Sequence, residues 1–171
     1  MTALDWHAPF EQLREGQRFR SRGRTVTESD VVAFAALTGD WHPQHSDAQW
    51  AAGSRFGERI AHGMLLVAFS VGLVPLDPGR VIALRRLHDV VFKRPLALGQ
   101  TIHVEGAVTR LAQLQDDAGL VGMRWEIQDE LGHLVCRAQV EVLWACQEPD
   151  RPRAGSGEAA PIEYAAGVFP C

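Results

Sequence analysis

The pattern of apolar and polar residues divides the chain into a helical first part and a strand-rich second part. Apolar side chains recur at helical spacing between residues 31 and 37, and Thr27 with Asp30 gives the arrangement of a capping box just before them. Gly39 is expected to end this helix, since glycine readily takes the left-handed conformation of a helix C-cap. A second, short helix is expected over residues 48–52.

The segment 60–74 is apolar except for His62 and Ser70. A helix that is apolar on nearly all sides is buried on nearly all sides, and about 15 residues are too few to span a bilayer. We therefore expect a central core helix that ends before Pro75, with Met64 packed in the core.

Alternating apolar and polar residues after Pro78-Gly79 predict a series of strands. The expected strands cover residues 81–92, 101–114, 120–129 and 134–146, after a first, polar edge strand over residues 17–26. Turns at 116–119 and 130–133 join consecutive strands, which indicates antiparallel pairing with the helices on one face. The fold class is therefore α+β, with an antiparallel sheet wrapped around a buried central helix. The opposite face of such a sheet, or its edge, would need to be covered. We therefore expect a homodimer or a higher homo-oligomer.

The length of the chain suits one domain with its own core. We divide it into an N-terminal lead-in over residues 1–16, a single domain over residues 17–146 and a Pro/Gly/Ala-rich tail over residues 147–171. Neither a signal peptide nor an apolar run of membrane-spanning length is expected.

Composition narrows the possible partners. The net charge of −4 argues against nucleic-acid binding, so neither nucleic acid nor a membrane is an expected partner. Cys136, Cys146 and Cys171 are an odd number without metal-ligand spacing, which indicates a reducing compartment and a cytoplasmic protein.

The candidate catalytic residues are concentrated in residues 38–47. Asp40, His42 and His45 lie within six residues of a loop that Pro43 stiffens. A carboxylate and an imidazole held in this way can jointly bind and deprotonate a water molecule. The alternatives are an ordinary polar loop and a metal site with three ligands. No fourth ligand follows at a suitable spacing and Pro43 restricts the loop, so we expect no metal here.

Two motifs occur in order along the chain. Gly39-Asp40-x-His42-Pro43-x-His45 is followed by Phe56-Gly57-x-x-Ile60-Ala61-His62-Gly63-Met64. Together they resemble the MaoC-like dehydratase, or (R)-specific enoyl-CoA hydratase, branch of the hot-dog fold superfamily. The later Phe92-Lys93-Arg94-Pro95 with Gly99 is also similar to that family, and the resemblance covers roughly residues 17–146.

The resemblance implies a hot-dog domain and a hydro-lyase. The reaction would be the reversible hydration of a trans-2-enoyl thioester to an (R)-3-hydroxyacyl thioester. By the same resemblance, Asp40 and His45 would hold the water, and the backbone N–H of Gly63 would donate to the thioester carbonyl. No cofactor would be needed beyond the carrier of the substrate, which is CoA or an acyl-carrier protein.

The chain departs from the family pattern at Gln100, where the family often has an acidic residue, and at two positions of the first motif. His42 stands where the family usually has Asn, and Gln44 stands where it has an aliphatic residue. We keep His42 among the candidate substrate-binding residues and leave its role open.

The other substrate-binding candidates are His62, Ser70, Arg85, Arg86, Lys93 and Arg94. Ser70 lies near a position where related hydratases carry a serine. The four basic residues are those nearest to a plausible phosphate contact, with a solvated strand face as the alternative. For His62 the alternative is a structural residue at the start of a helix.

Two further functions stay open at this point. A hot-dog thioesterase would direct the same water at the thioester carbonyl, and its product would be a free thiol. A non-catalytic subunit would bind acyl thioesters or pair with a catalytic partner without turnover. The presence of both Asp40 and His45 favours the enzymes.

Overall fold

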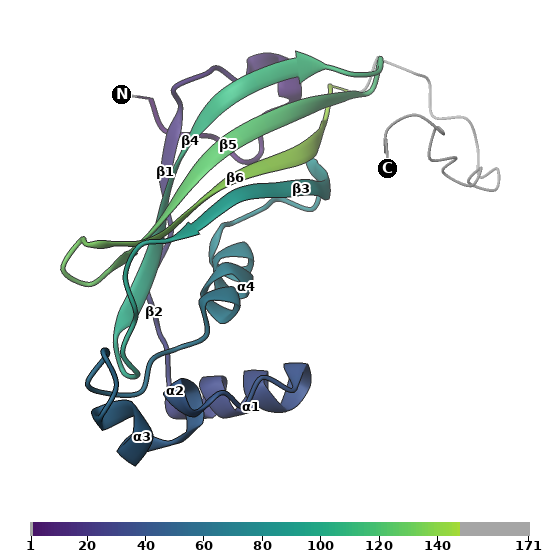
Figure 1. The fold of residues 1–171 in the computed structure, drawn as a ribbon. Helices are drawn as coiled ribbons and strands as arrows, with labels where there is room; N and C mark the ends of the chain where they lie inside the picture. Colours follow the sequence, from purple (N-terminus) through teal and green to yellow (C-terminus); the bar gives the residue numbers. More distant parts are fainter. Residues whose placement is uncertain (1, 148–171) are drawn as a thin grey trace.

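A curved antiparallel sheet forms the larger part of the molecule, as seen in a computed structural model that describes residues 2–147 (Figure 1). Four long strands build it: β3 (Val81–Phe92), β4 (Thr101–Gln113), β5 (Ala118–Asp129) and β6 (Leu134–Ala145). They are arranged in the order β4-β5-β6-β3. The short strands β1 (Arg18–Arg20) and β2 (Arg24–Thr25) both pair with β4 at the opposite edge from β3. The expected first strand is thus two short pieces, and the predicted antiparallel sheet is confirmed.

The helices precede the long strands. They are η1 (Phe10–Gln12), α1 (Glu28–Thr38), α2 (Pro43–Ser46), α3 (Ala48–Ala52) and α4 (Gly63–Leu73). The capping box of Thr27 and Asp30 is present, and Gly39 ends α1 with φ of +78°. The expectation of an open loop up to Asp47 was wrong in one respect, because Pro43 begins an additional single-turn helix.

Helix α4 lies on the concave side of the sheet and contacts β4 and β6 (Figure 1). Its buried side chains include Leu65, Leu66 and Leu73. Opposite them, alternate residues of the strands are buried, and Val121, Met123, Trp125 and Ile127 of β5 are among those at most 2% exposed. The sheet thus curves around one apolar helix, as the sequence predicts.

One face of α4 is nevertheless uncovered, which corrects the expectation of burial on nearly all sides. Met64, Ala68 and Gly72 are exposed, and their spacing of four residues places them on one face of the helix. The side chain of Met64 is 53% exposed and does not pack in the core as expected. Sequence periodicity could not show this, because every face of α4 is equally apolar.

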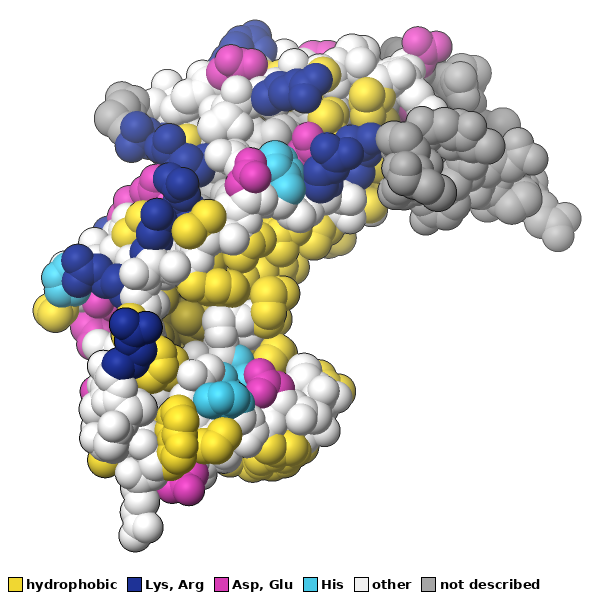
Figure 2. Space-filling model, in the orientation of Figure 1, with side chains coloured by type: hydrophobic (Ala, Val, Ile, Leu, Met, Phe, Trp, Pro, Cys, Tyr) yellow, Lys and Arg dark blue, Asp and Glu magenta, His cyan; other side chains and the backbone are white. Residues whose placement is uncertain are grey.

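The sheet edge at β3 also exposes apolar side chains, beside the exposed Arg86 and Asp89. Ile82, Leu84 and Phe92 are each at least 44% exposed, and no strand of the described residues pairs with the outer edge of β3. In Figure 2 apolar side chains line the hollow between the sheet and the helices at the lower end of the molecule. None of the helices between residues 2 and 147 has the length and apolar character needed to cross a membrane. Most of the predicted tail, residues 148–171 with Cys171, lies outside the described residues.

Candidate active site

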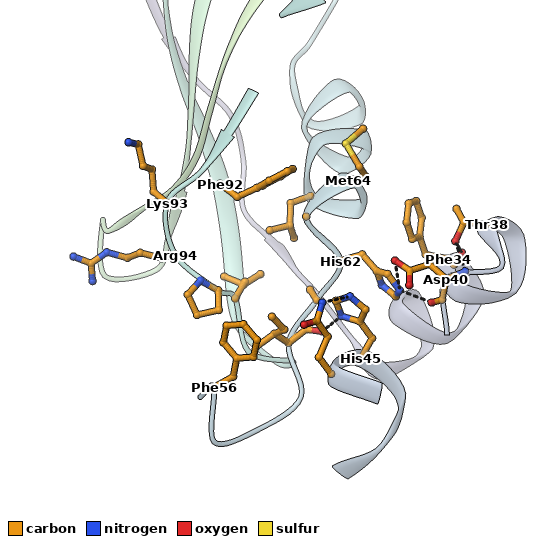
Figure 3. Close-up of a pocket in the computed structure, with 17 residues that line it drawn as sticks. Phe34, Thr38, Asp40, His45, Phe56, His62, Met64, Phe92, Lys93 and Arg94 are labelled. Carbon is orange, nitrogen blue, oxygen red and sulfur yellow. Dashed lines mark hydrogen bonds and ion pairs between the residues drawn. The ribbon is translucent and has the colours of Figure 1, made fainter. Parts of the chain in front are cut away.

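A cavity of about 590 Å³ lies where the start of α4, the segment between α1 and α3, and the end of β3 meet (Figure 3). Its polar lining comes from Thr38, Asp40, Gln44, His45, His62, Lys93 and Arg94. Its apolar lining includes three aromatic rings, Phe34, Phe56 and Phe92, together with Met64 and Leu66. A pocket with apolar walls and a few convergent polar groups suits an organic ligand with one reactive polar end.

The end of α1 positions Asp40 at the rim of this cavity. Its backbone N–H donates to Oγ1 of Thr38 at 3.3 Å, and its Oδ1 accepts from the backbone N–H of His42 at 3.3 Å. Its carbonyl oxygen lies 3.0 Å from Nε2 of His62. The carboxylate remains 53% exposed, so it can reach a ligand or a water in the cavity.

His45 is buried at the other side of the same segment. Its Nδ1 lies 2.7 Å from the carbonyl oxygen of Ile60. Because a carbonyl oxygen only accepts, Nδ1 carries a proton, and Nε2 holds the lone pair in the neutral ring. Burial lowers the pKa of His45 below its ordinary value; the hydrogen bond to Ile60 opposes this, and nearby His62 adds to the lowering. The ring therefore favours its neutral form, in which it can act as a base.

His62 holds these two residues together, a role that the sequence did not reveal. Its ring stacks on that of His45 with centroids 3.8 Å apart and an interplanar angle of 25°. Its Nε2 donates to the carbonyl of Asp40 and lies 3.9 Å from that residue's Oδ2. The ring of Phe34 in α1 packs against it at 5.1 Å. In the sequence, only the position of His62 directly before the central helix pointed to a structural role. That position does not predict the stacking of His62 on His45.

Gly63 begins α4 and lines the cavity. The first hydrogen bonds of the helix run from Leu65 and Leu66 to the carbonyl of His62, which leaves the N–H groups of Gly63 and Met64 without a hydrogen bond among the described residues. Free N–H groups at a helix N-terminus attract negative charge. A ligand carbonyl in the cavity can therefore accept a hydrogen bond here.

Asp40, His45 and His62 each present one potential ligand atom, all within 4.8 Å of one another. This set differs from the expected one, because His62 replaces His42. A ring nitrogen binds a metal in the plane of its ring, and two rings stacked 3.8 Å apart do not aim their lone pairs at one point. For one water held by a carboxylate and an imidazole, hydrogen bonds of about 2.8 Å at a tetrahedral angle put the two partners about 4.6 Å apart. The limit of 4.8 Å includes this separation, so one water can bridge Asp40 and His45.

His42, expected in the substrate-binding set, is not among the residues that line the cavity. It is the N-cap of α2, and its Nδ1 accepts from the backbone N–H of Gln44 at 3.2 Å. Asn is one of the strongest N-caps, so an Asn at this position could supply an acceptor of the same kind.

Ser70, Arg85 and Arg86 are likewise not among the residues that line the cavity. The hydroxyl of Ser70 is buried and donates to the carbonyl of Leu66 within α4. Arg85 and Arg86 project from β3 toward Glu141 of β6, at 3.0 and 3.7 Å. Of the expected basic residues, only Lys93 and Arg94 line the cavity, and both are exposed at its side (Figure 3).

Comparison with known proteins assigns the fold and the family. Residues 10–123 match the family model described as a MaoC like domain, which is more than half of the chain. The chain belongs to the MaoC-like domain family. The resemblance inferred from the two sequence motifs is thereby confirmed.

Two curated relatives show how far this MaoC-like similarity extends. The chain is 40% identical over 97 residues to a Klebsiella aerogenes protein named MaoC, a match that covers 56% of this chain but only 29% of that protein. It is 35% identical over 105 residues to the (R)-specific enoyl-CoA hydratase of Rhodospirillum rubrum, covering 60% of this chain and 70% of the relative. The chain thus spans most of the second relative and less than a third of the first.

Solved structures agree on the architecture. A monoamine oxidase regulatory protein from Archaeoglobus superimposes with a TM-score of 0.77 at 33% identity, covering 82% of this chain and 95% of that one. A Mycobacterium tuberculosis protein described as having a double hotdog fold gives a TM-score of 0.70 at 23% identity, over 96% of this chain and 52% of that one. At this low identity the likeness concerns the fold alone, and it confirms the predicted hot-dog architecture.

Proposed function

We propose that this MaoC-like protein catalyses the reversible hydration of a trans-2-enoyl thioester to an (R)-3-hydroxyacyl thioester. The observation that carries the proposal is the pairing of Asp40 and His45 on one cavity with the unbonded N–H of Gly63. Two relatives of this chain are named as enzymes of this kind, the (R)-specific enoyl-CoA hydratases of Rhodospirillum rubrum and Aeromonas caviae.

The first chemical requirement is polarisation of the thioester carbonyl. The C3 carbon of an enoyl thioester is a weak electrophile until negative charge can collect on the carbonyl oxygen. In our proposal the N–H of Gly63, at the positive end of α4, receives that charge. A preorganised donor of this kind typically stabilises the transition state by about 3–4 kcal/mol.

The second requirement is a water that can lose a proton. Asp40 and His45 would hold this water between them, and its oxygen would attack C3. The pair takes up the proton that the water loses and returns one proton to C2, so atoms and charges balance without another donor. General acid–base groups of this kind contribute roughly 10²- to 10⁴-fold each.

The substrate carrier would lie at the side of the cavity where Lys93 and Arg94 are exposed. Their positive charges suit the phosphates of CoA or of the prosthetic group on an acyl-carrier protein. The proposal needs no cofactor beyond this carrier and no metal. We further propose a cytoplasmic location, in keeping with buried free thiols at Cys136 and Cys146.

We also propose that two copies of the chain associate. Ile82 and Leu84 are exposed apolar residues on β3, and Met64 is exposed on the uncovered face of α4. A long, unpaired edge strand that exposes apolar side chains invites pairing with another strand. A twofold axis beside β3 would pair the β3 edges of the two copies. It would also cover the exposed face of α4 in each copy.

The function is tested by assaying a panel of short, medium and branched enoyl-CoA thioesters. Loss of the conjugated-thioester absorbance reports hydration, and a thiol reagent run in parallel reports hydrolysis. We expect absorbance loss without thiol release, and a drop of at least 10³-fold for Asp40→Asn at unchanged thermal stability. Thiol release would indicate a thioesterase instead, and an Asp40→Asn variant that keeps most of the activity would refute the proposed chemistry.

A further inference from the structure

Gln44 contacts the atom on which the proposed reaction depends. Its side-chain Nε2 lies 3.0 Å from Nε2 of His45, and both residues line the cavity. The backbone of Gln44 is fixed as well, because its carbonyl accepts from the N–H of Ile60 at 3.1 Å. This is one of the two positions where the chain departs from the motif it resembles, since an aliphatic residue is usual there.

The direction of this hydrogen bond follows from the other side of the imidazole. The carbonyl of Ile60 requires a proton on Nδ1 of His45, so Nε2 of the neutral ring can only accept. The amide nitrogen of Gln44 is therefore the donor. With the amide turned over, its carbonyl oxygen would face the lone pair of Nε2, which is repulsive.

The nitrogen that would take a proton from water thus already accepts a hydrogen bond from Gln44. The amide of Gln44 makes no second side-chain hydrogen bond among the described residues, and its side chain is only partly buried. A single hydrogen bond is all that fixes it, so rotation of the amide costs little beyond that bond.

We propose that Gln44 is a positioning residue that acts through His45, holding Nε2 in the free protein and moving off it when an acyl thioester binds. The inference rests on the proposed function for its kinetic consequences. An interaction present in the free enzyme but absent from both the substrate complex and the transition state weakens substrate binding and leaves the chemical step unchanged.

The decisive variant is Gln44→Met, which keeps the length of the side chain and removes its donor. We expect KM to fall by about threefold to tenfold while kcat stays within about twofold, from the typical net strength of one hydrogen bond. Gln49→Met, on the exposed surface of α3, is the matched control and should change neither constant. A fall in kcat at unchanged KM would overturn the proposal, since it would mean that Gln44 supports the transition state. Unchanged constants would overturn it as well.

Nitrogen NMR of His45 tests the contact without any turnover. In the free wild-type protein the Nε2 resonance should be that of a hydrogen-bonded, unprotonated nitrogen, and in Gln44→Met it should move toward the unbonded value. Saturated butyryl-CoA, which cannot be hydrated, should alter this resonance in the wild type and have a smaller effect in the variant. If Nε2 is equally unbonded in both free proteins, the proposal fails even when the hydratase activity is present. If the contact is seen but no enoyl thioester is hydrated, the proposed function fails and the contact stands.

Discussion

A Cβ atom added at Gly63 would lie 2.6 Å from Cε1 of Phe92. Real Cβ atoms essentially never come so close to another heavy atom. The absence of a side chain at Gly63 therefore lets the aromatic ring at the end of β3 lie directly against the start of α4. The ring of Phe92 thus lines the cavity beside the N–H groups that we propose as the carbonyl site.

Gly63→Ala should separate activity from stability. Phe92 is 49% exposed and can move aside, and alanine favours a helix over glycine by up to about 1 kcal/mol, so the free energy of unfolding should change by less than about 1.5 kcal/mol. The displaced ring would disturb the carbonyl site, and hydration should fall by about 10²- to 10³-fold. Denaturant unfolding and steady-state kinetics check both statements. Gly53→Ala, where an added Cβ meets ordinary contact distances, is the control and should keep full activity.

His42 offers a test of its role as the N-cap of α2. His42→Asn keeps an N-cap acceptor and should alter the free energy of unfolding by less than about 0.5 kcal/mol, whereas His42→Ala should cost about 1 kcal/mol. Chemical denaturation of the three proteins measures the difference. Equal stability of the Ala and Asn variants would show that the cap is dispensable.

The buried imidazole of His45 predicts a dependence of stability on pH. Its pKa in the folded protein is lowered, mainly by burial, so the unfolded chain binds more protons than the folded one between that lowered value and about 6.5. Stability should therefore fall as the pH drops from about 7.5 through this interval. His45→Gln cannot titrate, so its stability should decline less over the same pH range in urea unfolding. Parallel curves for the two proteins would contradict the assignment.

A single charged substitution on β3 should prevent the proposed association of two copies. Leu84→Asp places a carboxylate on the exposed apolar edge, where a twofold contact would bring two such charges together. We expect a dimer for the wild type and a monomer for this variant by light scattering after size-exclusion chromatography. Leu131→Asp is the control, since Leu131 is 73% exposed in the turn that precedes β6, whereas Leu84 lies opposite Val142 near the other end of β6. A monomeric wild-type protein would refute the association.

Much of the fold could be predicted because its signals are local. The capping box at Thr27, the stop at Gly39 and the alternation along β5 each depend on neighbouring residues, and each is present in the structure. Boundaries were less certain, as β5 begins at Ala118 within the turn expected over residues 116–119. The additional helix α2 was missed because four residues carry too little periodicity to be recognised.

The sequence by itself determined the family, the order of helices and strands, and the presence of Asp40 and His45 on one short segment. Only the tertiary structure decided which side chains meet. In the structure, His62 stacks on His45 and the side chain of Gln44 contacts Nε2 of the same ring. Arg85 pairs with Glu141 and does not line the cavity. One face of α4 is also left uncovered. The physical reason is that periodicity specifies the local backbone, whereas side-chain contacts depend on how distant segments pack and on what remains to cover each apolar surface.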